Sequence, residues 1–169
     1  MKRIVIYPDP ILRAKAQEVK EIDEGVARLA GEMAEVMYAA PGIGLAAPQV
    51  GISQRVILVD VGQMEGRREP ILLVNPVIVE QEGKVIQEEG CLSIPEVREK
   101  VQRAERVLVR GYDLRGRERE IEAQGLLAVA LQHEIDHLDG ILFIDRLSRL
   151  KRDIIERKIR KRLREMRRG

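Results

Sequence analysis

The strongest chemical signal in the sequence is a pair of histidines one helical turn apart. His133, Glu134 and His137 form an H-E-x-x-H pattern, which uses every histidine of the chain. At about 100° per residue, positions four apart lie on one helix face, so both imidazoles can bind one ion while Glu134 stands beside it. This pattern is typical of zinc sites in which the glutamate acts on water. A chance match in a charged helix is the alternative, but the sequence favours a metal-dependent hydrolase.

The third ligand of this site must be a cysteine or a carboxylate. A catalytic ion usually takes three protein ligands and a water, and the chain has no third histidine. Cys91, the only cysteine, is preferred because a thiolate completes a set suited to zinc or ferrous iron. A lone cysteine is more often a small buried core residue, and a downstream carboxylate such as Asp145 or Glu156 is the alternative ligand.

The helix that carries the histidines also has apolar residues on the side of His133. Leu126, Val129 and Ala130 fall one to two turns before it. Residues beside a metal on one helix face are placed to touch substrate as well. We therefore expect them to form an apolar wall of the site, although ordinary core packing explains the same pattern.

A glycine-rich segment, Gly42–Gly51, is a second candidate site element. It contains a G-x-G-x-x-A sequence, but a helix is expected before it and Pro48 closes it, whereas dinucleotide-binding motifs follow a strand and open a helix. We interpret it as a loop whose glycines let the backbone approach a ligand. Gln49 near its end is an uncharged donor able to polarise a carbonyl group, although a lone glutamine more often faces solvent.

Helices and strands must position these residues. Helical spacing of apolar residues predicts a helix over Glu24–Ala39 with Asp23 as its N-cap. A second helix is expected over residues 125–138, ended by Asp139 and Gly140. Ser148 is the candidate N-cap of a last helix over residues 149–169.

Runs of β-branched and aliphatic residues predict the strands. These runs cover residues 2–7, 55–60, 71–74, 77–82, 84–88, 105–112 and 117–121. Gly83 and the turn over 113–116 predict that the last four runs form two hairpins. The expected fold is α+β, with antiparallel strands around a central metal-binding helix, an N-terminal helix and a C-terminal helix, in one domain of residues 1–169.

Length and composition fit a single hydrophobic core. The chain has 169 residues, of which 44% are apolar. Its single cysteine excludes an intrachain disulfide and fits a reducing compartment. The opening apolar run stops at Pro8, too short for a signal peptide, and no run approaches the roughly 20 apolar residues that span a bilayer. We expect a soluble cytoplasmic protein.

Three segments together resemble the peptide deformylase family. They are Gly42–Gly51 (GIGLAAPQVG), Glu89–Pro95 (EGCLSIP) and Gln132–Leu138 (QHEIDHL), in the family's order and at its approximate separations. The opening Tyr7–Arg13 (YPDPILR) is similar too. The resemblance implies removal of the N-terminal formyl group from formyl-methionyl nascent polypeptides, with release of formate.

The resemblance also implies catalytic roles. The implied ligands of one divalent ion are Cys91, His133 and His137. Glu134 is the implied general acid and base, and Gln49 with the backbone N–H of Leu92 is the implied oxyanion hole. The expected ion is Fe²⁺, with Zn²⁺, Ni²⁺ or Co²⁺ able to substitute.

The expected substrate contacts come from the same resemblance. The methionine side chain is expected to enter an apolar pocket that includes Ile43, Leu126 and Val129, which agrees with the wall inferred from helical spacing. The backbone of Gly44 is expected to contact the bound peptide. Arg98 is a further expected peptide contact.

The C-terminal segment is strongly basic. Residues 149–169 carry eleven Lys or Arg and three Asp or Glu, a net of +8, whereas the other 148 residues have a net of −6. Apolar residues at helical spacing predict an amphipathic helix. It either packs on the body with a solvated cationic face or contacts the ribosome, where basic residues neutralise RNA phosphate. Since the segment lacks Trp and Phe, we expect no membrane contact.

Two other functions fit parts of the pattern. A zincin-type peptidase with Asp145 or Glu156 as third ligand would cut internal peptide bonds and keep its metal without Cys91. A non-enzymatic RNA-binding module built around the basic tail would hold a structural metal in a closed four-ligand site. Neither accounts for the segments 42–51 and 89–95 together.

Overall fold

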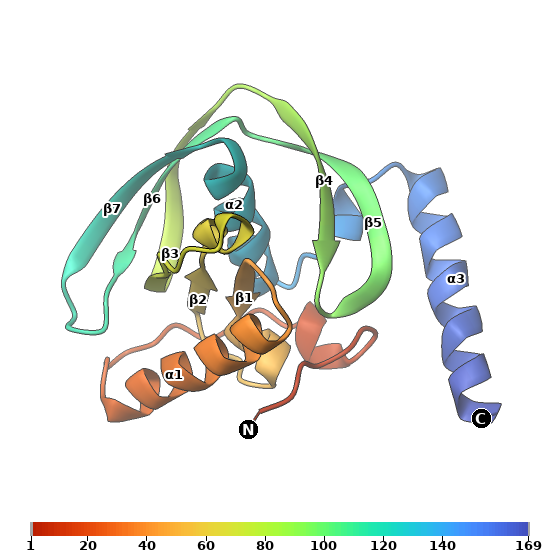
Figure 1. The fold of residues 1–169 in the computed structure, drawn as a ribbon, viewed down its shortest axis with the longest axis horizontal. Helices are drawn as coiled ribbons and strands as arrows, with labels where there is room; N and C mark the ends of the chain where they lie inside the picture. Colours follow the sequence, from red (N-terminus) through yellow and green to blue (C-terminus); the bar gives the residue numbers. More distant parts are fainter. Residues whose placement is uncertain (1, 169) are drawn as a thin grey trace.

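Antiparallel sheets surround one central helix in the computed structural model, which describes residues 2–168 (Figure 1). The helices are α1 (Glu24–Ala39), α2 (Gly125–Leu138) and α3 (Arg149–Arg168). The strands are β1 (Gly44–Ala46), β2 (Val56–Val59), β3 (Ile71–Glu82), β4 (Val85–Cys91), β5 (Ile94–Arg103), β6 (Arg106–Tyr112) and β7 (Glu118–Gln124). Short 3-10 segments are η1 (Pro10–Arg13), η2 (Ala47–Val50), η3 (Val61–Glu65) and η4 (Phe143–Arg146).

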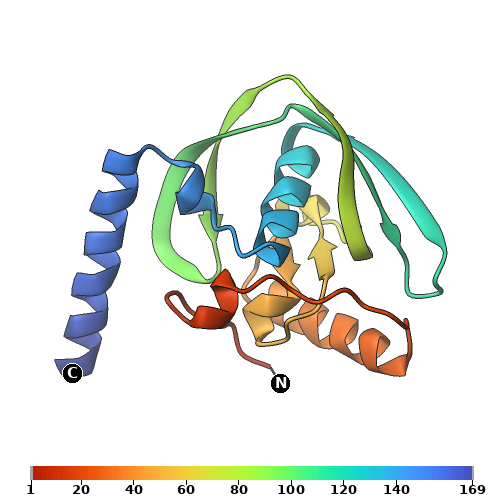
Figure 2. The ribbon, with the colours of Figure 1, turned by 180° about the vertical axis from the view of Figure 1, so that it is seen from behind.

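The strands form one large and one small sheet within residues 2–168. Five strands pair in the order β1-β2-β3-β6-β7, and β4 pairs with β5. Every pairing between these strands is antiparallel. Helix α2 lies inside the curved sheets and contacts β1, β2, β6 and β7, whereas α1 packs against β1 and β2 (Figures 1 and 2). The predicted α+β fold with antiparallel strands around a central helix is confirmed.

The two helices that frame the site have the predicted bounds. The Asp23 carboxylate accepts the N–H of Val26 at 3.2 Å and so caps α1. The apolar stripe of α1 is buried, namely Val26, Leu29, Met33, Val36 and Met37. Helix α2 is buried along most of its length because it occupies the centre of the fold. It ends before Gly140, whose φ of 74° is the left-handed conformation that favours glycine after a helix.

One predicted hairpin is wrong. Residues 71–74 and 77–82 form a single strand, β3, and this strand does not pair with β4. Glu82 instead pairs with Arg106 of β6, while Val85 pairs with Arg103 of β5. Gly83, with φ of 73°, is therefore a corner at which the chain crosses to the small sheet. The second predicted hairpin, between β6 and β7, is confirmed.

Two further strand predictions need correction. Residues 2–7 form no strand. Val5 donates its N–H to the carbonyl of Gln49 and Tyr7 donates to that of Ser93, so single hydrogen bonds link them to two different segments and no ladder forms with either. The glycine-rich segment is not all loop, since Gly44–Ala46 forms β1 against β2. Burial of Leu45 and Ala46, both 0% exposed, requires the backbone hydrogen bonds that this pairing supplies.

Strand β5 is absent from the sequence-based prediction. Its buried apolar residues, Ile94 and Val101, and the half-buried Val97 are spaced three and four apart, which resembles a helix more than a strand. Glu96 has φ of 65° and so interrupts the alternation of side chains along the strand. This strand supplies several residues of the site.

Helix α3 lies at the edge of the molecule beside β5 (Figures 1 and 2). Lys151 pairs with Glu99, Arg162 donates to the carbonyl of Pro95, and Ile155 belongs to the same buried cluster as residues of β5. The Ser148 hydroxyl accepts the N–H of Lys151 at 3.3 Å, as an N-cap does. Ile155 is the one buried residue among Arg149–Arg168. Within residues 2–168, no helix combines the length and apolar character that crossing a membrane requires. That residues 1–169 form one domain stays a prediction.

Candidate metal centre

Helix α2 and the end of β4 bring the three predicted ligands together. One ligand atom from each of Cys91, His133 and His137 lies within 4.8 Å of the others. Nε2 of His137 lies 3.2 Å from Nε2 of His133 and 3.4 Å from the Cys91 Sγ. Donors bound to one tetrahedral ion at about 2.0–2.3 Å would be about 3.3–3.6 Å apart. The donor set and its spacing therefore fit a single borderline-soft divalent ion.

A carboxylate behind His133 fixes the orientation of its ring. Oε1 of Glu89 lies 2.9 Å from Nδ1 of His133, so Nε2 faces the other two donors. Arg103 donates to both oxygens of Glu89 at 2.8 Å and to Asp136 at 2.7 Å. Burial alone would raise the pKa of Glu89, but the hydrogen bonds and positive charges of Arg103 and His133 lower that pKa to about 2. Glu89 is therefore a carboxylate that supports the ligand.

Replacing Arg103 by methionine should destabilise the fold strongly. The side chain of Arg103 is 3% exposed, and its loss leaves the carboxylates of Glu89 and Asp136 buried without their cation. Breaking such a buried pair costs about 3–5 kcal/mol. Chemical denaturation would measure the change in the free energy of unfolding.

Arg110 provides the matched control for this prediction. It also pairs with two carboxylates, Glu118 and Glu120, but its side chain is 44% exposed. Surface pairs contribute about 0–1 kcal/mol, so Arg110→Met should have a small effect. Equal losses of stability in the two variants would contradict the buried role of Arg103.

Glu134 lies beside the cluster with an unused oxygen. It is 4% exposed, and its Oε1 has no hydrogen-bond partner among the described residues. Burial raises the pKa of Glu134 to about 7. A cation at the cluster would lower this pKa, because a nearby positive charge favours the carboxylate. Glu134 is therefore placed to exchange protons, because its Oε1 is not engaged in a hydrogen bond that holds the fold together.

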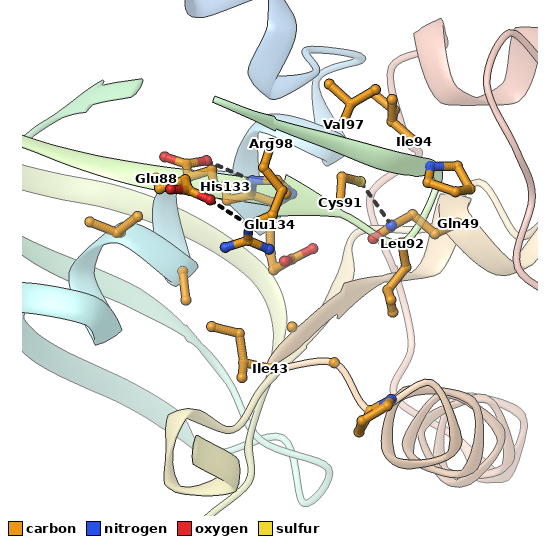
Figure 3. A pocket seen from close by; sticks show the side chains of 18 of the residues that line it. Ile43, Gln49, Glu88, Cys91, Leu92, Ile94, Val97, Arg98, His133 and Glu134 are labelled. Carbon is orange, nitrogen blue, oxygen red and sulfur yellow. Dashed lines mark hydrogen bonds and ion pairs between the residues drawn. The ribbon is translucent and has the colours of Figure 1, made fainter. Parts of the chain in front are cut away.

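The cluster faces a pocket of about 600 Å³ (Figure 3). Eleven of the residues that the sequence analysis names as site candidates line it: Ile43, Gly44, Gln49, Cys91, Leu92, Arg98, Leu126, Val129, Ala130, His133 and Glu134. His137, 1% exposed, is the ligand buried behind it. The structure thus brings the three separate sequence segments to one cavity of the size that binds small ligands.

Gln49 is held rigidly at one side of this pocket. It is 1% exposed, so the solvent-facing alternative is wrong. Its Oε1 accepts the N–H of Ala46 at 2.9 Å. Its Nε2 lies 3.1 Å from the Ser93 hydroxyl and 3.5 Å from the Cys91 Sγ, toward which it points in Figure 3. The amide donor is therefore oriented next to the metal ligands.

Arg98 lies at the outer edge of the pocket. Its Nε donates to Glu88 at 2.7 Å, and the two side chains face each other in Figure 3. Both are largely exposed, at 64% and 57%. This pair gives one side of the opening a polar, charged character.

Several residues of the site are not identifiable from sequence. Glu89 lies inside the segment 89–95, but its hydrogen bond with His133 joins β4 to α2 and cannot be inferred from either segment alone. Asp136 lies within the H-E-x-x-H pattern, but nothing in the sequence signals its contact with Arg103. Arg103 belongs to the unpredicted strand β5, and nothing in the sequence signals its role.

The alternative third ligands lie away from the cluster. Asp145 accepts the N–H of Leu142 at 2.9 Å and pairs with Arg13. Glu156 pairs with Arg152 and Arg160, each at 3.6 Å. The cluster found among residues 2–168 contains neither carboxylate.

Comparisons with known proteins agree with this arrangement. The family described as polypeptide deformylase matches residues 1–153. A peptide deformylase of Syntrophobacter fumaroxidans is 56% identical over 162 residues, covering 96% of this chain and 95% of that protein. One from Alkalilimnicola ehrlichii is 54% identical over 162 residues, covering 96% and 90%.

Solved structures show the same similarity. The crystal structure of a peptide deformylase from Legionella pneumophila has a TM-score of 0.91 and 44% identity, covering 100% of this chain and 99% of that one. The peptide deformylase from Thermus thermophilus has a TM-score of 0.88 and 46% identity, covering 97% and 96%. Both likenesses extend over nearly the whole chain.

Proposed function

The chain belongs to the peptide deformylase family, and on this premise we propose that Glu134 transfers the protons of its reaction. That reaction is hydrolysis of the N-terminal formyl group of formyl-methionyl polypeptides, which releases formate. The proposed ligands of one divalent ion are Cys91, His133 and His137. The observation that carries the assignment is their clustering within 4.8 Å beside a pocket that Glu134 lines.

Glu134 acts at both ends of the reaction. A divalent ion at the centre supplies Lewis acidity, which polarises a carbonyl group and makes water more acidic. Glu134 accepts a proton from the water whose oxygen adds to the formyl carbon. It then delivers this proton to the amine nitrogen as the carbon–nitrogen bond breaks. Its buried Oε1, which has no partner among the described residues, is available for that exchange.

Two donors stabilise the negative charge that develops on the formyl oxygen. They are the Nε2 group of Gln49 and the backbone N–H of Leu92, which follows Cys91 directly. The bond from Ala46 to Gln49 at 2.9 Å holds the amide in place before substrate arrives. Such preorganised donors supply a large part of the rate enhancement in related chemistry.

The substrate's methionine side chain occupies the apolar part of the pocket. Ile43 lines it from the segment before β1, and Leu126 and Val129 line it from α2. The backbone of Gly44 runs along the same wall and contacts the peptide. Arg98 contacts the peptide at the opening, and its bond to Glu88 at the pocket edge supports this role.

Gly44→Ala should impair catalysis by displacing Glu134. A Cβ at Gly44 would overlap Oε2 of Glu134 and lie 3.0 Å from its Cδ. A displacement of about 1 Å in a reacting group can cost about 100-fold in rate, so kcat for formate release should fall by roughly that factor. Metal content should not change, because none of the three ligands moves.

Gly31→Ala is the matched control. Gly31 lies in α1, and a Cβ there would meet nothing within 4 Å. Its kcat should equal that of the wild type. A Gly44→Ala enzyme with wild-type kcat would show that a Cβ at position 44 does not displace the Glu134 carboxylate.

The resident ion is proposed to be Fe²⁺, with Zn²⁺, Ni²⁺ or Co²⁺ able to replace it. One thiolate and two imidazoles suit these borderline ions. A thiolate ligand and a single cysteine also support a reducing, cytoplasmic location.

Reconstitution tests the ion and the reaction together. The metal-free protein is loaded with Fe²⁺ under exclusion of oxygen, and formate release from a formyl-methionyl peptide is measured. Release that a chelator abolishes is expected. No release with Fe²⁺, Ni²⁺, Co²⁺ or Zn²⁺ would exclude deformylation, and cleavage of internal peptide bonds would be assayed next.

The basic helix α3 is proposed to contact the ribosome, from which the substrate emerges. Among the exposed cations of this helix that make no ion pair within residues 2–168, four share one face at helical spacing: Arg157, Lys158, Lys161 and Arg164. Together they give α3 a cationic face that RNA phosphates can neutralise.

Sedimentation with ribosomes across a salt series tests this contact. Replacing the four cations by glutamine should weaken co-sedimentation and flatten its salt dependence. The control replaces four exposed cations of the body, Lys15, Lys20, Arg115 and Arg119. Equal binding by both variants would rule out docking through α3.

A further inference from the structure

An exposed methionine lies at the opening of the pocket. Met64 in η3 is 69% exposed, although a large apolar side chain in water is unfavourable. Among the exposed large apolar residues of the described chain, Met64 is the one that lines this pocket. None of the assigned catalytic steps uses it.

The segment that carries Met64 is fixed at both ends. Asp60, 0% exposed, accepts the N–H of Glu69 at 3.0 and 3.1 Å and the hydroxyl of Tyr38 at 2.5 Å. These bonds join the start of the β2–β3 connection, at Asp60, to its end at Glu69 and to Tyr38 of α1. The side chain of Gln63 also reaches the carbonyl of Gly42 at 3.5 Å, next to the pocket wall. A preorganised segment costs less to order when a ligand binds.

The place of Met64 relative to α2 decides what it can touch. Segment η3 contacts α2, the helix that carries Leu126 and Val129 (Figure 1). Met64 therefore extends the apolar wall outward from the methionine site. The exposed ion pair of Glu88 and Arg98 also lines this pocket. The opening thus has an apolar contribution from Met64 and a charged one from the ion pair.

A polypeptide substrate must pass through this opening. Its formyl carbon reacts at Glu134 and its methionine side chain fills the inner apolar wall, so the next residue lies where the pocket meets solvent. The volume of about 600 Å³ exceeds what one formyl-methionyl residue fills. Methionine is flexible and packs against apolar groups of many shapes.

We infer that Met64 is a specificity-determining residue that packs against the side chain of the substrate's second residue and favours an apolar one. This inference rests on the proposed deformylation. It predicts a preference for formyl-Met-Leu-Ala over formyl-Met-Asp-Ala. The preference should appear in KM, because contact at the opening is equal in the ground state and the transition state.

Steady-state kinetics of formate release with these two peptides test the inference. In the iron-loaded Met64→Ala enzyme, KM for the leucine peptide should rise about 5- to 10-fold, the effect of losing part of one apolar contact. Its kcat, and both constants for the aspartate peptide, should stay within about 2-fold. Met64→Leu should restore the preference, and Met64→Lys should shift it toward the aspartate peptide.

Met166→Ala is the matched control, since Met166 is 70% exposed on α3 and does not line the pocket. It should leave all constants unchanged. Wild-type release of formate with the same peptide preference in Met64→Ala would overturn the inference and leave the proposed function intact. A wild-type enzyme that releases no formate from either peptide would overturn both.

Discussion

Replacing Glu134 by glutamine is expected to lower kcat for formate release by about 10²- to 10⁴-fold, the usual contribution of a general acid–base group. Glutamine keeps the shape of the side chain but cannot accept the proton of water. No protein group takes over, because Oε1 of Glu134 has no partner among the described residues. The loss should fall on kcat and leave KM nearly unchanged, since Glu134 is assigned to proton transfer and not to binding.

Metal analysis separates this effect from damage to the centre. Glu134 is not one of the three clustered donors, so the variant should bind one ion per chain as the wild type is expected to do. Glu120→Gln is the control and should keep the wild-type kcat. Glu120 is an exposed carboxylate of β7 that pairs with Arg110 of β6. Nearly full turnover by Glu134→Gln with its ion bound would remove Glu134 from the proposed mechanism.

The predictable part of the fold depends on local signals. Helix α1 has its capping aspartate and a regular apolar stripe within one stretch of sequence, so its predicted bounds are correct. Gly83 misleads the prediction because a glycine with positive φ serves equally in a hairpin and in a corner between sheets. Which strand lies beside β4 depends on contacts between distant segments, such as the buried cluster that joins Ile94 and Val101 of β5 to Phe143 of η4, and no local signal reports that.

The predictable part of the site has the same limit. His133, Glu134 and His137 lie within one turn of a helix, so their geometry follows from helical spacing. The support from Glu89 and Arg103 arises where β4 and β5 pair behind α2, and it therefore becomes visible only in the folded chain. The contribution proposed for Met64 likewise becomes visible only in the folded chain, where Met64 lines the pocket.

Removal of the Cys91 thiol is expected to lower activity as much as the loss of Glu134, but by weakening the binding of the metal ion. Cys91→Ala leaves two imidazoles, and an ion with two protein ligands is held weakly. Loss of an outer partner of a ligand costs about 10- to 100-fold in metal affinity, so loss of a ligand itself should cost more than that. Competition with a chromogenic chelator measures this affinity directly, without reference to turnover.

The same measurement distinguishes the two choices of third ligand. If Asp145 or Glu156 completed the site, as in a zincin-type peptidase, Cys91→Ala would keep its metal and Asp145→Asn or Glu156→Gln would lose it. The structure argues for the opposite outcome, because both carboxylates pair with arginines and the Cys91 Sγ lies 3.4 Å from His137. Cys91→Asp offers a separate check, since an anionic oxygen at this position should recover part of the affinity that alanine loses. Recovery with aspartate but not with alanine would show that position 91 contributes a ligand atom and not merely a small side chain that fills the end of β4.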